Sequence, residues 1–533
     1  MNENEKMRKR NLIAYPLGTV GRDGIYQLFT NFLLTFVLLT KGLDVAQISV
    51  ITVIMVAARI FDAVNDPVMG YIIERTRTNW GKFKPWLAIG MVTTSIVVIS
   101  IFTSPFTGWG FVVHFGIAYF LYSITYTMHD ISYWGMVPAL SSDADTRNNL
   151  TSRAILCAGI GGTLLSMLVP MLTVGSNPVG GSAKTAFGIV SIVVCVIALI
   201  FISVTIFGVI EPNPHGEKKE GESKKHASIK DVVGTVLKNR PLMWMVIIFL
   251  IQQIGNGLIG GGVGSMYVYF TYGYEGGLYS LFSTIGVAAT AVLMVIYPMI
   301  SKKFERKQIM KFMMLVSAVG YVLMIAIGII GTGLPNMASF WLMTIGYMLS
   351  NFGQYGFYLV MMISILNTVE YNEYHSGHRE EAIITSTRPF LTKLASAIII
   401  AFTSITYIIC RVTDVTNSIQ TIDTNVELTA EEKALEISNL LNGVDSSQKL
   451  LMLLLMTIVP FVLMFISFIL YMKKYELTEK EYDRIVEELR VRHEKFPGLD
   501  GLPTEEMEME YAKAHSDSTP EPPIEEPQEG KEE

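Results

Sequence analysis

Long apolar stretches alternate with short polar ones along most of the chain. A run of about 17–25 mostly apolar residues crosses a hydrocarbon core of about 30 Å as a helix. Runs of this kind predict twelve spans, near residues 14–40, 46–74, 85–104, 110–138, 150–175, 186–210, 240–270, 277–300, 310–331, 337–366, 384–411 and 449–472. The pattern therefore predicts an all-α polytopic membrane protein.

The twelve spans fall into two groups of six, with a charged linker between them. We predict a first six-helix half at 1–210, a cytoplasmic linker at 211–239 and a second half at 240–474. The second half contains a long external loop, 412–448, in which 428–441 is expected to be helical. Residues 475–533 are expected to form an amphipathic cytoplasmic helix followed by a disordered acidic tail rich in Pro and Glu.

Composition supports the membrane assignment. Only 17% of the 533 residues are charged and the mean hydropathy is +0.41, whereas soluble proteins carry about 25% charged residues. We find no metalloprotease helix motif, nucleophile elbow or phosphate-binding loop. The sequence therefore predicts a protein that is not an enzyme, with no cofactor and no nucleic-acid partner.

Lysine and arginine residues indicate the orientation. They gather in alternate loops, which contain Arg8, Arg10, Arg75, Arg77, Lys82, Arg147, Lys302, Arg306, Arg379 and Lys473. The intervening loops are short and nearly free of positive charge. By the positive-inside rule, we expect a multi-pass protein of the cell membrane with both termini in the cytoplasm.

One ionisable cluster stands inside the second span. Asp62, Asn65 and Asp66 are spaced i, i+3, i+4, so they share one face of a helix. Charges at membrane depth are costly, by roughly 2.5–3.5 kcal/mol each on insertion scales. Two carboxylates and an amide oxygen form a hard-oxygen site suited to Na⁺ or H⁺. The alternative is structural pairing of the two acids with Arg59.

A second set of polar residues suits a sugar. Arg22 and Asp23 lie in the first span, Asp130 and Trp134 in the fourth, and Arg153 opens the fifth. Planar charged groups hydrogen-bond adjacent hydroxyls, and an aromatic ring stacks on the C–H face of a pyranose. For each residue alone, a satisfied interhelical hydrogen bond explains the sequence equally well. Taken together they favour a solvated cavity.

These residues lie in recognisable motifs. Arg59–Gly70, Arg77–Trp86, Tyr126–Asp130 and Asn367–Tyr374 resemble the glycoside–pentoside–hexuronide:cation symporter family of the major facilitator superfamily. The resemblance covers about residues 10–475. It implies twelve helices in two six-helix halves and a secondary transporter without enzymatic activity.

The resemblance also implies residue roles. It suggests a cation site formed by Asp62, Asn65 and Asp66 with Thr127, in which Na⁺ is a plausible ion, and a lysine, Lys393, that links this site to the second half. It further implies a sugar site, in which Asp23 and Asp130 hold hydroxyls, Arg153 joins the two acids, and Trp134 is the stacking ring.

Three positions depart from the family pattern. Arg22 stands where the family has a lysine, Tyr358 where a tryptophan is expected, and Ser132 where a proline follows Asp130. These residues line or support the sugar pocket, so the particular sugar stays open.

The basic residues between the second and third spans have two interpretations. They serve as a topology signal, which explains their charge completely. The resemblance adds a cytoplasmic gate, in which Arg75, Arg77 and Lys82, together with Arg379, pair with acids across the two halves.

The sequence therefore predicts a secondary active transporter that couples uptake of a glycoside to Na⁺ or H⁺ by alternating access. Its expected partners are a small glycoside, a monovalent cation and the lipid bilayer, with a monomeric transport unit. Two alternatives remain, a carrier of lysolipid-like amphiphiles with the same fold and a transport-inactive sugar sensor.

Overall fold

The computed structural model describes residues 3–141, 143–175, 177–210, 229–260, 262–331, 336–377 and 380–495. These residues form helices and their connections, with no strand among them. The membrane-length helices are α1 (Glu3–Thr40), α2 (Val45–Arg75), α3 (Lys84–Phe102), α4 (Gly108–Leu140), α5 (Ala144–Thr173), α6 (Ala183–Gly208), α8 (Arg240–Gly260), α10 (Gly276–Ser301), α11 (Arg306–Gly331), α12 (Met337–Leu366), α14 (Glu381–Ile409) and α17 (Ser446–Lys474). The shorter helices are α7 (Ile229–Lys238), α9 (Gly262–Tyr272), α13 (Thr368–Ser376), α15 (Val412–Asp423), α16 (Ala430–Asn442) and α18 (Glu479–Lys495).

Twelve helical segments in the described part of the chain are long and apolar enough to cross a membrane. One of them combines α8 and α9, and another combines α12 and α13. The predicted all-α fold with twelve spans is therefore confirmed.

Local chemistry fixes several helix ends. Asp44 caps α2 by accepting from the backbone N of Gln47, whose side chain accepts in turn from the backbone N of Asp44. Thr429 and Glu432 form the same reciprocal capping box at the start of α16. Each box satisfies backbone N–H groups that have no partner inside the helix.

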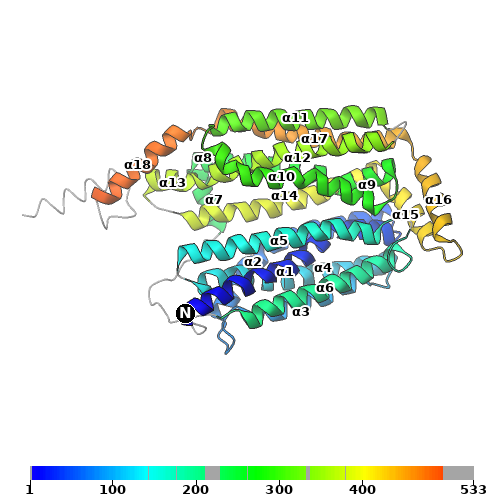
Figure 1. The fold of residues 1–533 in the computed structure, drawn as a ribbon, viewed down its shortest axis with the longest axis horizontal. Helices are drawn as coiled ribbons and strands as arrows, with labels where there is room; N and C mark the ends of the chain where they lie inside the picture. Colours follow the sequence, from blue (N-terminus) through cyan, green and yellow to red (C-terminus); the bar gives the residue numbers. More distant parts are fainter. Residues whose placement is uncertain are drawn as a thin grey trace, which may run out of the picture. The chain divides into compact units, whose positions relative to one another are not determined.

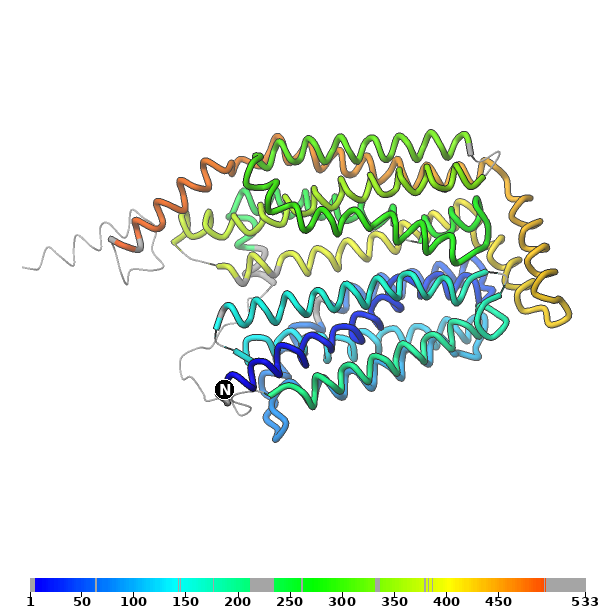
Figure 2. The backbone as a smooth tube through the Cα atoms, viewed as in Figure 1, coloured from blue at the N-terminus to red at the C-terminus, as the bar shows by residue number. Residues whose placement is uncertain are grey.

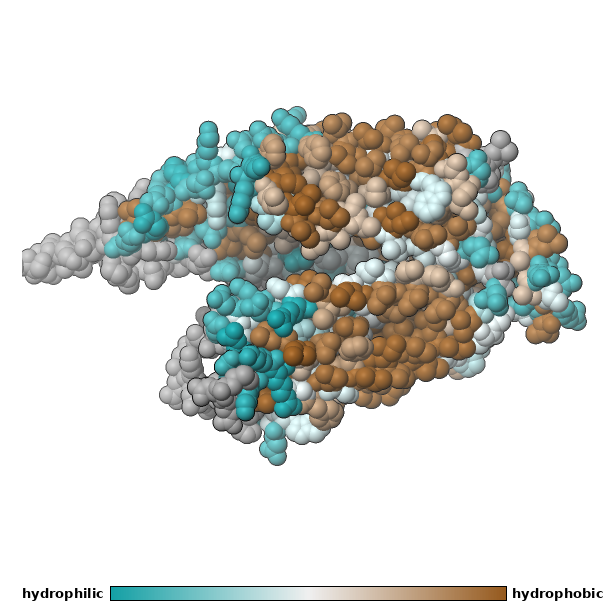
Figure 3. Space-filling view, in the orientation of Figure 1, coloured by the Kyte–Doolittle hydropathy of each residue, from teal (hydrophilic) through white to brown (hydrophobic). Residues whose placement is uncertain are grey.

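The chain packs as two compact units. The larger one comprises Met1–His226, Ile247–Val360 and Pro389–Met472. Within it, α1 packs against α5 and α6, α4 packs against α2 and α3, and α5 packs against α10 (Figure 1). Its outer surface is apolar, as expected for contact with lipid, with exposed side chains such as Ile200 and Phe207 on α6 (Figure 3).

The smaller unit comprises Ala227–Val246, Met361–Arg388 and Lys473–Glu533. Its helices α13 and α18 pack together. Asn239 Nδ2 donates to the carbonyl of Thr368 at 2.9 Å, and Tyr475 OH donates to the carbonyl of Ser364 at 3.1 Å. The expected amphipathic helix after residue 475 corresponds to α18, whereas the expected disordered tail lies outside the described residues from 496 onward.

The connection between α14 and α17 belongs to the larger unit and lies at the end of the bundle opposite the N terminus (Figure 2). We call this end the far end, and the end with Arg75, Arg77 and Lys82 the basic end. The connection contains α15 and α16. α15 packs against α1, and Asn417 Nδ2 donates to the carbonyl of Leu43 at 3.0 Å. The second half of the chain thus contacts the first half at the far end.

Candidate functional site

Helices α2 and α4 bring the four residues of the expected cation site together. Thr127 Oγ1 donates to Asp66 Oδ1 at 3.1 Å. Asp62 accepts a short hydrogen bond from the hydroxyl of Ser123, and Asn65 Nδ2 donates to the Ser123 carbonyl at 3.4 Å. The acids and amide of α2 therefore face the hydroxyls of α4 and form an oxygen-rich cluster, which we call the α2 cluster.

Lys393 joins this cluster from α14, in the second half of the chain. Its ammonium pairs closely with Asp66 Oδ2. The side chain of Asp66 is 36% exposed and that of Lys393 is 31% exposed. About a third of each side chain is thus accessible, so a solvated ion can reach Asp66.

Arg59 also belongs to the α2 cluster. Its guanidinium lies 3.6 Å from Asp62 Oδ2, and both side chains are nearly buried. The pairing that the sequence left as an alternative is therefore present, but it involves only Asp62. Asp66 is engaged by Thr127 and Lys393.

Arg22 is the centre of a second cluster, which we call the Arg22 cluster. Its side chain is only 4% exposed. Its guanidinium donates to both carboxylate oxygens of Asp23 at 2.8 Å and forms a short ion pair with Asp130. It also lies 5.0 Å from the ring of Trp134, a cation–π contact. Four of the six expected sugar residues thus meet at one point.

Helix α4 connects the two clusters. Ser123, Thr127, Asp130 and Trp134 recur at spacings of four, three and four residues, which places them along one stripe of the helix. Thr127 and Asp130 are separated by about 4.5 Å along the axis, at 1.5 Å per residue. At that separation the charges of the two clusters interact. A charge that enters one cluster therefore acts on the other.

Arg153 and Tyr358 have other surroundings. Arg153 is exposed and donates to the carbonyl of Leu12 at 3.2 Å, so the guanidinium that joins Asp23 to Asp130 in this structure is Arg22. The ring of Tyr358 packs near Phe249, with centroids 6.0 Å apart. Sugar contacts by Arg153 and Tyr358 stay predictions.

The expected gate residues make local contacts. Arg75 stacks on Tyr71 at 4.1 Å, Arg77 donates to the carbonyl of Glu74 at 2.6 Å, and Lys82 lies 4.7 Å from the Phe83 ring. Arg379 lies outside the described residues. The gate therefore also stays a prediction.

Sequence reasoning missed Ser123. The signal that could have revealed it is its position one turn before Thr127 on the same helix face. The sequence also placed Arg22 in the sugar pocket without showing that it bridges two acids, because that contact depends on how α1 packs against α4.

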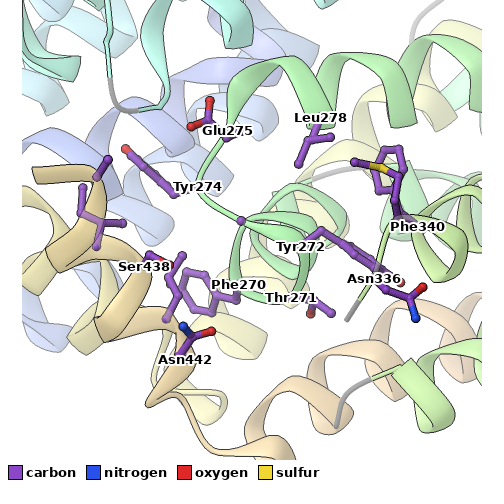
Figure 4. Close-up of a pocket in the computed structure, with 15 residues that line it drawn as sticks. Phe270, Thr271, Tyr272, Tyr274, Glu275, Leu278, Asn336, Phe340, Ser438 and Asn442 are labelled. Carbon is purple, nitrogen blue, oxygen red and sulfur yellow. The ribbon is translucent and has the colours of Figure 1, made fainter. Parts of the chain in front are cut away.

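Two cavities of the larger unit have polar groups in their walls. One, of about 550 Å³, is lined by parts of α1, α2, α5, α6, α8, α9, α10, α12 and α14, among them Gln27, Asn31 and Arg59. The other, of about 350 Å³, lies between α16 and the ends of α9, α10 and α12, with Tyr272, Phe340 and Asn442 in its wall (Figure 4). None of the predicted site residues lines the second cavity.

Twelve membrane-length helices define the class of protein as a multi-pass membrane protein, and the family to which it belongs is one of transporters. The chain belongs to the MFS/sugar transport protein family, which matches residues 14–479. The resemblance to the glycoside–pentoside–hexuronide:cation symporters, a family of sugar transporters, is thereby confirmed.

Curated relatives are similar at modest identity. A lactose permease of Leuconostoc lactis is 29% identical over 409 residues, 72% of this chain and 60% of the relative. A lactose permease of Lactobacillus helveticus is 26% identical over 513 residues, 91% and 73% of the two chains. A raffinose carrier protein of Pediococcus pentosaceus is 26% identical over 401 residues, 72% and 60%. The match with the first and third of these relatives thus spans about 60% of their length.

Solved structures support the fold. A bacterial homologue of the lysosomal transporter Spinster has a TM-score of 0.57 at 10% identity, covering 89% of this chain and 99% of that one. The nucleoside transporter NupG has a TM-score of 0.56 at 14% identity, covering 86% and 99%. At such identities the similarity concerns the fold alone.

Proposed function

We propose that this chain is a symporter that moves a sugar together with a monovalent cation, Na⁺ or H⁺, by alternating access. The observation that carries the proposal is the separation of the α2 and Arg22 clusters by one turn of α4. The first cluster offers oxygen ligands to a cation. The second offers paired acids, a guanidinium and an indole to sugar hydroxyls and a pyranose face.

The charges of the two clusters support a need for a cation. Asp23, Asp62, Asp66 and Asp130 are four carboxylates, and Arg22, Arg59 and Lys393 are three basic side chains, which leaves one negative charge when all are ionised. Uncompensated charge at membrane depth is costly. One bound monovalent cation makes the combined site neutral, the state best suited to cross between the two faces of the membrane.

Lys393 supplies the switch in this proposal. Its ammonium is paired with the carboxylate of Asp66, which a bound cation would also contact. Cation and ammonium therefore compete for Asp66. A bound cation releases Lys393 and changes the field at Asp130, one turn along α4. The cation thus favours the conformation that binds sugar, which is coupling by differential affinity.

The relatives support the substrate class, since their names specify lactose and raffinose. The basic loops support a location in the cell membrane with both termini in the cytoplasm. One chain holds both clusters, which supports a monomeric transport unit.

The test uses the full chain in proteoliposomes and labelled lactose and raffinose. An inward Na⁺ or proton gradient is expected to drive accumulation, and Asp66→Asn is expected to reduce it to background while downhill flux persists. Asp145→Asn, at an exposed acid in the first turn of α5, is the matched control and should behave like the wild type. Accumulation that persists in Asp66→Asn would show that the α2 cluster does not couple transport to the cation.

A further inference from the structure

Tyr15 on α1 and Tyr133 on α4 form a reciprocal pair of hydrogen bonds. The Tyr15 hydroxyl donates to the Tyr133 carbonyl at 2.9 Å, and the Tyr133 hydroxyl donates to the Tyr15 carbonyl at 2.5 Å. The two rings are stacked, with centroids 4.4 Å apart and planes at 18°. Both residues are fully buried. Each ring is therefore held at both ends, by its own helix and by the backbone of the other helix.

Helix α1 leaves space for the Tyr133 ring at a glycine. Gly18 lies three residues after Tyr15, and a Cβ there would lie 2.9 Å from Cε2 of Tyr133 and 2.4 Å from Oγ1 of Thr205. The Thr205 hydroxyl is itself fixed, because it donates to the carbonyl of Ala14 at 2.9 Å. A side chain at position 18 would therefore displace the Tyr133 ring, and glycine keeps its place open.

The ring of Tyr133 lies beside the Arg22 guanidinium. The guanidinium carbon is 5.2 Å from the centre of this ring, a cation–π contact like the one that it makes with Trp134. The rings of Tyr133 and Trp134 are nearly perpendicular, at 89°, with centroids 5.6 Å apart. Two rings at right angles therefore restrict where the guanidinium can lie.

Helix geometry explains why the tyrosine pair acts on Arg22. Arg22 follows Tyr15 by seven residues, or two turns, and Tyr133 follows Asp130 by three, so each pair shares one face of its helix. Long side chains in a helix point back toward its N terminus, which brings the Arg22 guanidinium toward the tyrosines. The Tyr15–Tyr133 and Arg22–Asp130 links thus join the same two helix faces, and the first sets the register of the second.

We propose that Tyr133 is a positioning residue for sugar recognition and that Tyr15 is its anchor. The reciprocal hydrogen bonds hold the Tyr133 ring, and the ring holds the Arg22 guanidinium between Asp23 and Asp130. The two acids then keep the geometry in which they bind sugar hydroxyls. The inference rests on the proposed function and adds to it two residues that act through Arg22.

Tyr133→Phe tests this inference, because it removes the hydroxyl and keeps the ring. In proteoliposomes containing the full chain, we expect the KM for lactose or raffinose to rise about threefold to tenfold, as for loss of one hydrogen bond, while the maximal rate changes by less than about twofold. Tyr15→Phe leaves the hydrogen bond of the Tyr133 hydroxyl in place. Its KM should therefore rise less, by about twofold to threefold, and it carries the test if Tyr133→Phe does not fold.

Tyr475→Phe is the matched control. The Tyr475 hydroxyl is also buried and also donates to a backbone carbonyl, that of Ser364 at 3.1 Å, but both residues belong to the smaller unit. This variant should lower the unfolding midpoint about as much as Tyr133→Phe and leave the KM unchanged. A loss of stability alone therefore does not produce the predicted rise in KM.

A second background tests the route through Arg22. Arg22→Lys lacks the planar guanidinium, so adding Tyr133→Phe to it should change the KM by less than about twofold. The full effect of Tyr133→Phe on that background would overturn the inference. An unchanged KM in the tyrosine variants that fold, or an equal rise in Tyr475→Phe, would overturn it as well, and the proposed function would stand. Uptake of neither lactose nor raffinose by the wild type would overturn the proposed function and the inference with it.

Discussion

Arg22 is a buried guanidinium that holds carboxylates from two helices, Asp23 on α1 and Asp130 on α4. The sequence identified all three residues as candidates, because ionisable groups inside apolar spans are costly and usually functional. It did not identify Arg22 as the bridge and assigned that role to Arg153 by resemblance. Which arginine reaches both acids depends on the packing of α1 against α4, and no local sequence pattern encodes that contact.

Replacing Arg22 is predicted to have a large effect on stability and sugar binding, whereas replacing Arg153 is predicted to have a small effect on stability. Arg22→Gln leaves Asp23 and Asp130 without their cation, and breaking a buried pair in this way costs roughly 3–5 kcal/mol. We expect it to abolish sugar binding and to lower the thermal unfolding midpoint. Arg153→Gln changes an exposed side chain bonded to one carbonyl, so its stability effect should stay within about 0.5 kcal/mol.

Thermal unfolding with and without lactose measures both effects in detergent-purified protein. Arg22→Lys, which keeps the charge but loses the planar fork, should give an intermediate result. A larger loss of lactose-dependent stabilisation in Arg153→Gln than in Arg22→Gln would contradict the assignment of the bridge to Arg22.

At the scale of elements, α5 and α10 form one contact between the two halves of the chain. Ser280 Oγ donates to the carbonyl of Met167 at 2.7 Å, and Gly276 N donates to the carbonyl of Val174 at 3.1 Å. A Cβ at Gly276 would lie 1.8 Å from the Pro170 carbonyl oxygen. Only glycine allows this approach, so the contact depends on residue 276.

The adjacent glycines Gly276 and Gly277 give a matched pair. Gly276→Ala forces α5 and α10 apart and disfavours closure of the far end, at a cost of roughly 1–3 kcal/mol. We expect a slower initial rate of lactose exchange in proteoliposomes. Gly277→Ala, where the added Cβ meets no atom within 4 Å, should exchange like the wild type. Equal rates in the two variants would show that this contact is not part of the transport cycle.

The external connection is a second contact between the halves. Asp423 at the end of α15 accepts from the backbone N of Ala183 at 2.8 Å, so it caps α6. Burial raises the pKa of the Asp423 carboxyl, against the opposing effects of the Ala183 hydrogen bond and Lys433. The folded chain therefore binds this proton more tightly than the unfolded chain. The stabilisation that Asp423 gives the folded chain is therefore lost as the pH rises from the ordinary pKa of aspartate to the raised pKa of Asp423.

Substitution of Asp423 separates the hydrogen bond from the charge. Asp423→Ala removes the acceptor and should cost about 1–2 kcal/mol, as loss of a helix cap does. Asp423→Asn keeps an acceptor oxygen, so it should cost less and should remove the fall in stability with rising pH. Unfolding midpoints measured from pH 4 to pH 7 check both expectations, with Glu427→Gln as an exposed control in the same connection. A pH dependence that persists unchanged in Asp423→Asn would contradict this account.

The helices of this connection also show what the sequence predicts well. The pattern predicted a helix at 428–441, close to α16, because its apolar residues recur with helical period. It missed α15, whose sequence is rich in threonine, valine and isoleucine and has weak helix propensity. Val412, Thr416 and Ile419 are buried in the structure, so packing rather than local preference supports this helix.

At the scale of the whole molecule, the sequence predicted the twelve spans because their length and hydropathy are local properties. It also placed Asp62, Asn65 and Asp66 on one helix face, since that depends only on spacing. The pairing of Asp66 with Lys393 joins residues 327 positions apart, and it entered the sequence analysis only through family resemblance. The 550 Å³ cavity, which is lined by both halves of the chain, was not predicted, because it exists only once nine helices have packed.

Cation binding at the α2 cluster and sugar binding at the Arg22 cluster are coupled, in this account, by a single free energy. If so, a cation that strengthens sugar binding by some factor must itself bind more tightly by the same factor when sugar is present. Asp66→Asn should remove both effects, because it removes the acid for which cation and Lys393 compete.

The most direct test is calorimetric titration of purified protein with lactose at saturating and zero Na⁺ and at two pH values, followed by the reverse titration with Na⁺. We predict that Na⁺ or protons increase lactose affinity by roughly 5–150-fold, the range typical of such coupling. Lactose should increase cation affinity by the same factor, and Asp66→Asn should show neither change. Lactose binding in the wild type that is independent of both Na⁺ and pH would contradict the account.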